Sequence, residues 1–110
     1  LHDIETRTPC HPLYALMNLL ARLQGKTLDE IRNAAAADPS NIDAQFDVAD
    51  LDLSGGHVQD AFERLLDLFG AADAETRKRI RERLLELFEV VGVTDPRVNA
   101  ARAKLATLMY

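Results

Sequence analysis

Residues 42–54, IDAQFDVADLDLS, constrain the fold most, because this stretch is compatible at first sight with either a strand or a helix. Apolar residues alternate from Ile42 to Val48, as in a half-buried strand, and Ser54-Gly55-Gly56 would then form a hairpin turn. The alternation changes phase at Ala49, so a strand would need a bulge there, and the interleaved acidic residues are unfavourable in strands. The segment is therefore predicted to be a helix.

On a helix, the same residues separate into polar stripes and apolar arcs. One narrow polar stripe holds Asp43, Asp47, Asp50 and Ser54, and Gln45 and Asp52 lie nearly opposite it. Two apolar arcs lie between them: Ala44, Val48 and Leu51 on one side, and Ile42, Phe46, Ala49 and Leu53 on the other. Burying each large apolar side chain contributes about 1.5–3 kcal/mol, whereas each interior Asp costs about 0.5–0.7 kcal/mol. We therefore expect this helix to be sandwiched between neighbours and stabilised by packing.

Start and stop signals divide the rest of the chain into helices. Thr27 and Glu30 have the spacing of a capping box, which predicts a helix that Asp38-Pro39 ends. Asp95 and Pro96 are typical of an N-cap and a first helical residue. The expected helices cover about residues 12–23, 28–37, 43–54, 58–70, 74–91 and 96–109, after a loose lead-in over residues 1–9. The inner face of the last helix is expected to contain Val98, Ala101, Leu105, Leu108 and Met109.

Six helices joined by short loops predict an all-α fold, in which antiparallel helix pairs stack as a short tetratricopeptide-like array. Ala49, Gly56 and Ala61 have the spacing of the small residues in that repeat, and Asp38-Pro39 stands where a preceding repeat would close. Polar residues replace the bulky aromatics expected early in the first helix of the repeat, at Gln45 and Asp52. The repeat is therefore degenerate, and residues 10–110 are expected to form a single domain.

Charge is distributed unevenly along the chain, whose net charge is -5. Residues 38–73 carry one Lys or Arg against nine Asp or Glu, whereas residues 74–110 carry eight against five. The basic run from Arg77 to Arg83 is interleaved with glutamates and lacks stacking aromatics, which makes nucleic-acid binding unlikely. A solvated helix face with i,i+4 ion pairs is the favoured interpretation of this run.

Candidate partner-binding residues come from these two charged stretches. Asp43, Asp47 and Asp50 could attract Lys or Arg from a protein partner, with a solvated helix face as the simpler alternative. Arg77 and Arg81 are the corresponding candidates in the basic run, and the two charged stretches could also drive weak, salt-dependent self-association.

The sequence gives no sign of catalytic, metal or cofactor chemistry. Cys10 and His11 are adjacent, but no orienting third group can be identified, so we expect no catalytic residue and no enzyme. His2, His11 and His57 have no metal-ligand spacing, and His57 is expected in a loop or at a helix start. The lone cysteine favours a reducing, cytoplasmic location. No apolar run approaches the length of about 20 residues that a membrane span needs, which agrees with that location. The chain opens on Leu1 rather than Met, so a longer parent protein is expected.

Residues 31–110 resemble a known domain in the order and spacing of their packing positions. The two matching stretches are IRNAAAADPSNIDAQFDVADLDLSGGHVQDAFERLLDLF and RERLLELFEVVGVTDPRVNAARAKLATLMY. They are similar to the C-terminal tetratricopeptide-like domain of bacterial thioredoxin-fold proteins of the chaperedoxin group. This resemblance implies a co-chaperone module that binds unfolded clients or a chaperone partner, with any redox chemistry left to a thioredoxin domain. The alternative is an architectural helical domain that mediates self-association.

Overall fold

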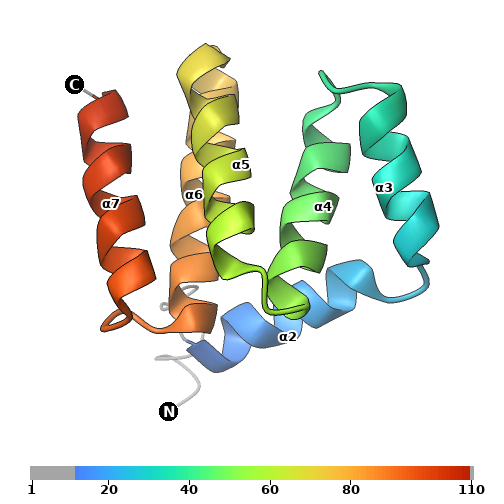
Figure 1. The fold of residues 1–110 in the computed structure, drawn as a ribbon, viewed down its shortest axis with the longest axis horizontal. Coiled ribbons are helices and arrows are strands. Elements are labelled where there is room, and N and C mark those ends of the chain that lie inside the picture. The colour runs from blue at the N-terminus through green and yellow to red at the C-terminus, as the bar shows by residue number, and fades with distance from the viewer. Residues whose placement is uncertain (1–11, 110) are drawn as a thin grey trace.

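The computed structural model describes residues 12–109, which form six α-helices (Figure 1). Their bounds are α2 (Pro12–Leu23), α3 (Leu28–Ala37), α4 (Ile42–Ser54), α5 (Val58–Ala71), α6 (Ala74–Val91) and α7 (Pro96–Met109). The segment that could have been a strand is helix α4. This part of the chain is an all-α array of helices, as the sequence predicts.

Helix α4 is sandwiched between neighbours, and its two apolar arcs enter different clusters. Ala44 and Val48 join Ile31 and Ala35 of α3 in a small cluster, against which Leu51 also packs. Phe46, Ala49 and Leu53 belong to the main core. The remaining buried members of that core are Leu19, Val58, Ala61, Phe62, Leu65, Leu66, Phe69, Ile80, Leu84, Leu87, Phe88, Val98, Ala101 and Leu105. The predicted sandwich is therefore confirmed.

The inner faces of α5, α6 and α7 close the main core at the C-terminal end. Phe62 of α5 meets Phe88 of α6 edge to face, with ring centroids 5.1 Å apart, which is a favourable geometry for two aromatic rings. Val98, Ala101 and Leu105 of α7 are buried, as predicted for its inner face. Met109 was expected on this face but its side chain is 41% exposed, because it is the last residue of α7 and extends past the core.

Side-chain caps begin most of these helices. Thr27 Oγ1 accepts a hydrogen bond from the Glu30 backbone N–H (3.1 Å), which confirms Thr27 as the N-cap of α3. Asn41, which the sequence analysis did not identify as a cap, accepts from Ala44 N–H (3.2 Å) and starts α4 at Ile42. Asp95 accepts from Arg97 N–H (2.8 Å) at the start of α7. Helix α6 ends at Gly92, whose φ of 117° favours glycine.

Helix α2 lies differently from the other helices. Figure 1 shows α2 running across the lower ends of the upright helices, and its packing partners are α4 and α6. Ala15 and Leu19 are its buried side chains. Its outer side exposes Leu16, Met17 and Leu20, whose exposed fractions are 41%, 55% and 54%. Helix α2 therefore covers one face of the array rather than forming a closed pair with α3.

The N-cap of α6 predicts a specific pH dependence. The Asp73 carboxylate accepts from Thr76 N–H (2.8 Å), and this hydrogen bond lowers the pKa of Asp73 below its ordinary value. A carboxyl group with a lowered pKa stabilises the fold above its unfolded-state pKa, and this stability is lost as the pH falls through the folded-state pKa. We expect Asp73→Ala to flatten the acid limb of a stability-against-pH curve measured by urea unfolding. An Asp73 carboxyl pKa at its ordinary value by NMR titration would contradict this assignment.

Candidate functional site

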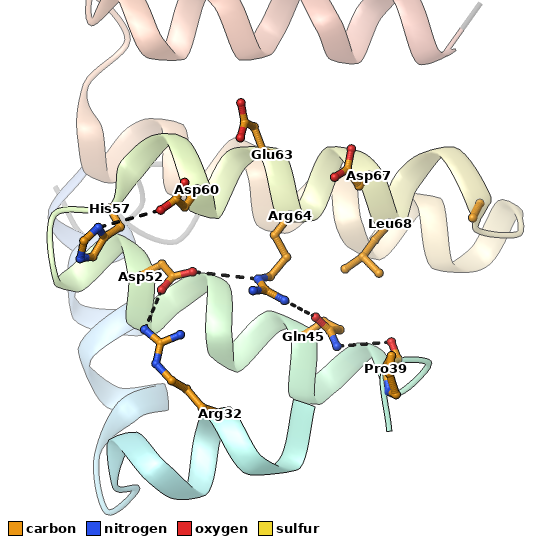
Figure 2. Close-up of a pocket in the computed structure, with 11 residues that line it drawn as sticks. Arg32, Pro39, Gln45, Asp52, His57, Asp60, Glu63, Arg64, Asp67 and Leu68 are labelled. Carbon is orange, nitrogen blue, oxygen red and sulfur yellow. Dashed lines mark hydrogen bonds and ion pairs between the residues drawn. The ribbon is translucent and has the colours of Figure 1, made fainter. Parts of the chain in front are cut away.

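An open groove lies between α3 and α5 in the described residues 12–109 (Figure 2). It encloses about 730 Å³, and α4 forms its floor. Helix α3 contributes Arg32 to its lining, the α3–α4 turn contributes Pro39, and α4 contributes Gln45 and Asp52. The remaining lining residues lie at the start of α5 or along it: His57, Asp60, Glu63, Arg64, Asp67, Leu68 and Ala71. We refer to it below as the α3–α5 groove.

The floor of the α3–α5 groove is polar and internally bonded. Arg32 Nη2 donates to Asp52 Oδ1 (3.0 Å), and Arg64 Nε lies 4.0 Å from Asp52 Oδ2. Arg64 Nη1 donates to Gln45 Oε1 (2.7 Å), and Gln45 Nε2 donates to the Ala35 (3.4 Å) and Pro39 (3.3 Å) carbonyls. One chain of polar contacts therefore joins α3, α4 and α5, as Figure 2 shows. The degenerate positions Gln45 and Asp52 are the centre of this floor.

The α5 wall of the groove is acidic. Asp60, Glu63 and Asp67 recur along α5 and are all exposed. In Figure 2, Arg64 and Leu68 extend towards α4, while Glu63 and Asp67 stand at the outer edge of α5. His57 stands at the start of α5, as expected, with its Nδ1 3.9 Å from Asp60 Oδ2. The open side of the groove therefore presents these carboxylates together with the partly exposed guanidinium groups of Arg32 and Arg64.

This groove was not predicted from the sequence, although Arg64 is a signal of it. Arg64 is the single basic residue among nine acidic residues in segment 38–73, and it contacts the two α4 residues that replace aromatics. Arg32 carried no sequence signal, because only the fold brings α3 beside α4.

The acidic stripe of α4 meets cations from within the chain, which corrects the interpretation of a solvated helix face. Asp50 is fully buried, so it cannot contact a partner directly. Asp47 Oδ2 accepts from Lys26 Nζ (2.8 Å), and the exposed Asp43 pairs with Arg79 of α6. The stripe thus faces α2 and α6 at Asp50 and the α2–α3 turn at Asp47, whereas Asp43 stays exposed to water beside Arg79.

Asp50 is the centre of a cluster formed with Arg22, Arg83 and Glu86, here called the Asp50 cluster. Arg22 forms two bonds to the carboxylate, Nε to Oδ2 (2.8 Å) and Nη2 to Oδ1 (3.1 Å), and its Nη1 lies 2.6 Å from Glu86 Oε1. Arg83 Nη1 donates to Asp50 Oδ2 (2.9 Å). Burial lowers the pKa of Arg83, whereas for Arg22 the bonds to Asp50 and Glu86 outweigh burial and raise the pKa.

The basic run of α6 is engaged between helices, which corrects the expectation of i,i+4 pairs within α6. The ion pairs shown for its arginines in the described part of the chain go to Asp43 and Asp50 of α4. Arg77 donates to the Phe69 (3.0 Å) and Gly70 (3.2 Å) carbonyls and so caps the end of α5. Arg81 is exposed beside a depression of about 360 Å³ that Phe69, Lys78 and Met109 also line.

Three of the residues considered for metal or nucleophile chemistry are not covered by the described structure, whereas His57 lines the α3–α5 groove. Cys10, His2 and His11 lie outside the described residues. Within residues 12–109, no group of three or more His, Cys, Asp or Glu side chains is placed to hold a metal ion. None of the helices in this range has the length and hydropathy that a membrane span requires.

Comparison with known proteins identifies the helical array. Residues 21–110 match the tetratricopeptide repeat family over most of the chain. The chain belongs to this family. The match includes α3 to α7 and the last three residues of α2. No solved structure matches the chain significantly.

Similar proteins occur in mycobacteria. The chain is 44% identical over 70 residues to the protein named Uncharacterized protein Mb1359 in Mycobacterium bovis. The proteins named MT1366 and Rv1324 in Mycobacterium tuberculosis show the same identity over the same length. Each match covers 64% of this chain and 23% of the relative, so the shared repeat region spans about a quarter of each relative's length.

The Asp50 cluster predicts a large difference between two carboxylates of the same stripe. Asp50→Asn removes the carboxylate that two mostly buried arginines share and leaves Glu86 as the remaining carboxylate of the cluster, so we expect it to lower the free energy of unfolding by about 3 kcal/mol. The matched change Asp43→Asn removes an exposed pair and should cost less than about 1 kcal/mol. Urea unfolding followed by circular dichroism measures both values. Equal costs would show that the Asp50 cluster does not hold the helices together.

Proposed function

We propose that this tetratricopeptide repeat domain is a protein-interaction module that binds an extended, basic segment of a protein partner in the α3–α5 groove. Tetratricopeptide repeat domains generally mediate protein–protein interaction. The observation that carries the proposal is the groove itself, with its bonded polar floor and its acidic wall on α5. A preorganised floor reduces the side-chain ordering that binding would otherwise require.

The chemistry of the groove suits Lys or Arg side chains flanked by small polar or apolar residues. Asp60, Glu63 and Asp67 are exposed and can pair with cations at the rim. The exposed carbonyl groups of an extended segment can accept hydrogen bonds from the arginines of the floor, Arg32 and Arg64, which are partly open to solvent. Pairs at such an exposed rim are screened by salt, so binding should weaken as ionic strength rises.

The more specific role is that of a non-catalytic module in a thioredoxin-like co-chaperone of the cytoplasm, which binds unfolded clients or a chaperone partner. The support for this role is the resemblance of residues 31–110 to the chaperedoxin tail, together with a groove that fits extended chain. Unfolded clients present extended segments with exposed Lys and Arg, which is the ligand that the groove favours. Of the residues first considered for partner binding, Asp43, Asp47, Arg77 and Arg81 remain candidates for a secondary contact.

Self-association is a second candidate function, and the outer side of α2 favours it. Leu16, Met17 and Leu20 lie on one side of α2 and are exposed. Exposed apolar side chains that gather on one helix face are a feature of protein interfaces. A concentration-dependent dimer in light scattering, with no affinity for unfolded protein, is the result that would favour this function.

Charge reversal of the groove wall tests the proposal. The probe is an unfolded client protein, kept unfolded by reduction and carboxymethylation and labelled with fluorescein. We expect Asp60→Lys/Asp67→Lys to weaken binding of this probe at least about tenfold at low salt. Each lost rim pair contributes up to about 1 kcal/mol, and repulsion between cations adds to the loss. Fluorescence anisotropy measures the affinity.

The matched control is Glu75→Lys/Glu82→Lys, which makes the same charge change at the same spacing on α6. It should bind like the unaltered protein, because neither residue lines the groove. A parallel titration with a labelled oligonucleotide checks that any remaining binding belongs to protein. Equal weakening by both double variants would assign the effect to net charge and remove the groove from the proposal.

A further inference from the structure

Helix α2 is attached to the repeat array mainly through one side. Its buried side chains, Ala15 and Leu19, point to the array, and Arg22 follows them on the same side at its C-terminal end. The three residues are spaced i, i+4 and i+7, which places them on one helix face. The family match begins at residue 21, so most of α2 lies outside the matched repeat.

The end of α2 is held by the Asp50 cluster. Arg22 bridges Asp50 of α4 and Glu86 of α6, two helices that also contact one another. Leu19 enters the main core together with Phe46, Leu84 and other residues of these two helices. The face of α4 and α6 beneath α2 therefore combines apolar side chains with two carboxylates that form ion pairs with one guanidinium.

The surroundings of α2 allow it to leave this face as a unit. Asp50 would keep its bond to Arg83 (2.9 Å) and would not be left as an unpaired buried charge. Gly25, between α2 and α3, has a φ of 81°, and no heavy atom lies within 4 Å of the position that a Cβ would take there. The main packing partners of α2 are α4 and α6, and Leu23, its last residue, also packs against the small cluster of α3 and α4. The direct contact between α3 and α4 does not itself involve α2.

We infer that the face of α4 and α6 beneath α2 is a second docking surface, which binds an amphipathic helix carrying an arginine, and that α2 is its built-in occupant. The partner helix presents a small residue, a leucine and an arginine at the spacing of Ala15, Leu19 and Arg22. Its arginine takes the place of Arg22 between Asp50 and Glu86. This surface lies across α4 from the α3–α5 groove, because Asp50 and Asp52 face different helices.

An internal occupant lowers the apparent affinity for a partner in proportion to the fraction of molecules in which α2 is open. Weakening the attachment of α2 should therefore strengthen binding of a helix supplied from outside. The probe is a fluorescein-labelled peptide with the sequence of residues 12–25. A second peptide, with alanine at the position of Arg22, tests the need for the arginine.

We expect Arg22→Ala in the full chain to bind the residues 12–25 peptide about tenfold more tightly than the unaltered protein does, by fluorescence anisotropy. In hydrogen exchange, the α2 amides of this variant should exchange faster while those of α4 and α6 keep their protection. Arg32→Ala is the matched control, because it also takes one of two arginines from a buried carboxylate, Asp52, but lies away from α2. It should change neither peptide affinity nor exchange in α2.

The inference is overturned if the peptide binds Arg22→Ala no more tightly than the unaltered protein, or if the alanine peptide binds as well as the peptide with the arginine. Should Arg22→Ala not fold by circular dichroism, the unaltered protein decides the question. Excess peptide must then accelerate exchange of the α2 amides, and unchanged exchange at saturating peptide overturns the inference. Groove variants such as Asp60→Lys/Asp67→Lys should bind the residues 12–25 peptide as tightly as the unaltered protein does. This result separates the surface beneath α2 from the α3–α5 groove of the proposed function.

Discussion

The burial of two aspartates on one helix is the constraint on which the arrangement depends. Asp50 and Asp52 of α4 are 0% and 6% exposed, and a buried carboxylate without a cation is strongly unfavourable. Arginines from α2 and α6 meet Asp50, and arginines from α3 and α5 meet Asp52. Four other helices thus supply the arginines that pair these carboxylates, and burial of α4 requires that at least one arginine reaches each carboxylate.

These ionic contacts define the position of the helices more than they add to stability. A buried ion pair gains little over a well-packed apolar pair, because desolvation offsets most of the Coulomb attraction. The apolar clusters on each side of α4 supply the packing free energy, and the carboxylates restrict which neighbours can supply it. We interpret the replacement of aromatics by Gln45 and Asp52 in the same way, since it exchanges apolar packing for a bonded floor and leaves the α3–α5 groove open.

The helices and the sandwich of α4 could be predicted because they depend on local signals. Thr27, Asp95 and the periodicity of residues 42–54 are read directly from neighbouring residues. The environment of the charges could not be predicted, because a carboxylate stripe has the same pattern whether it faces water or arginines from distant helices. Arg22 and Arg83 lie 28 and 33 residues from Asp50 along the chain, and only the fold shows that they share it. The groove was missed for the same reason.

The two surfaces on either side of α4 differ in what closes them, and this difference bears on how the protein could act. The α3–α5 groove is open, with Arg32 and Arg64 partly accessible, so a partner can enter without rearrangement. The opposite face is covered by α2, so a partner there must first compete with Ala15, Leu19 and Arg22. Because Arg83 also holds Asp50, the competition concerns the guanidinium of Arg22 and the apolar side chains of Ala15 and Leu19. A helical partner displaces α2 only to the extent that it binds this face more tightly than α2 does.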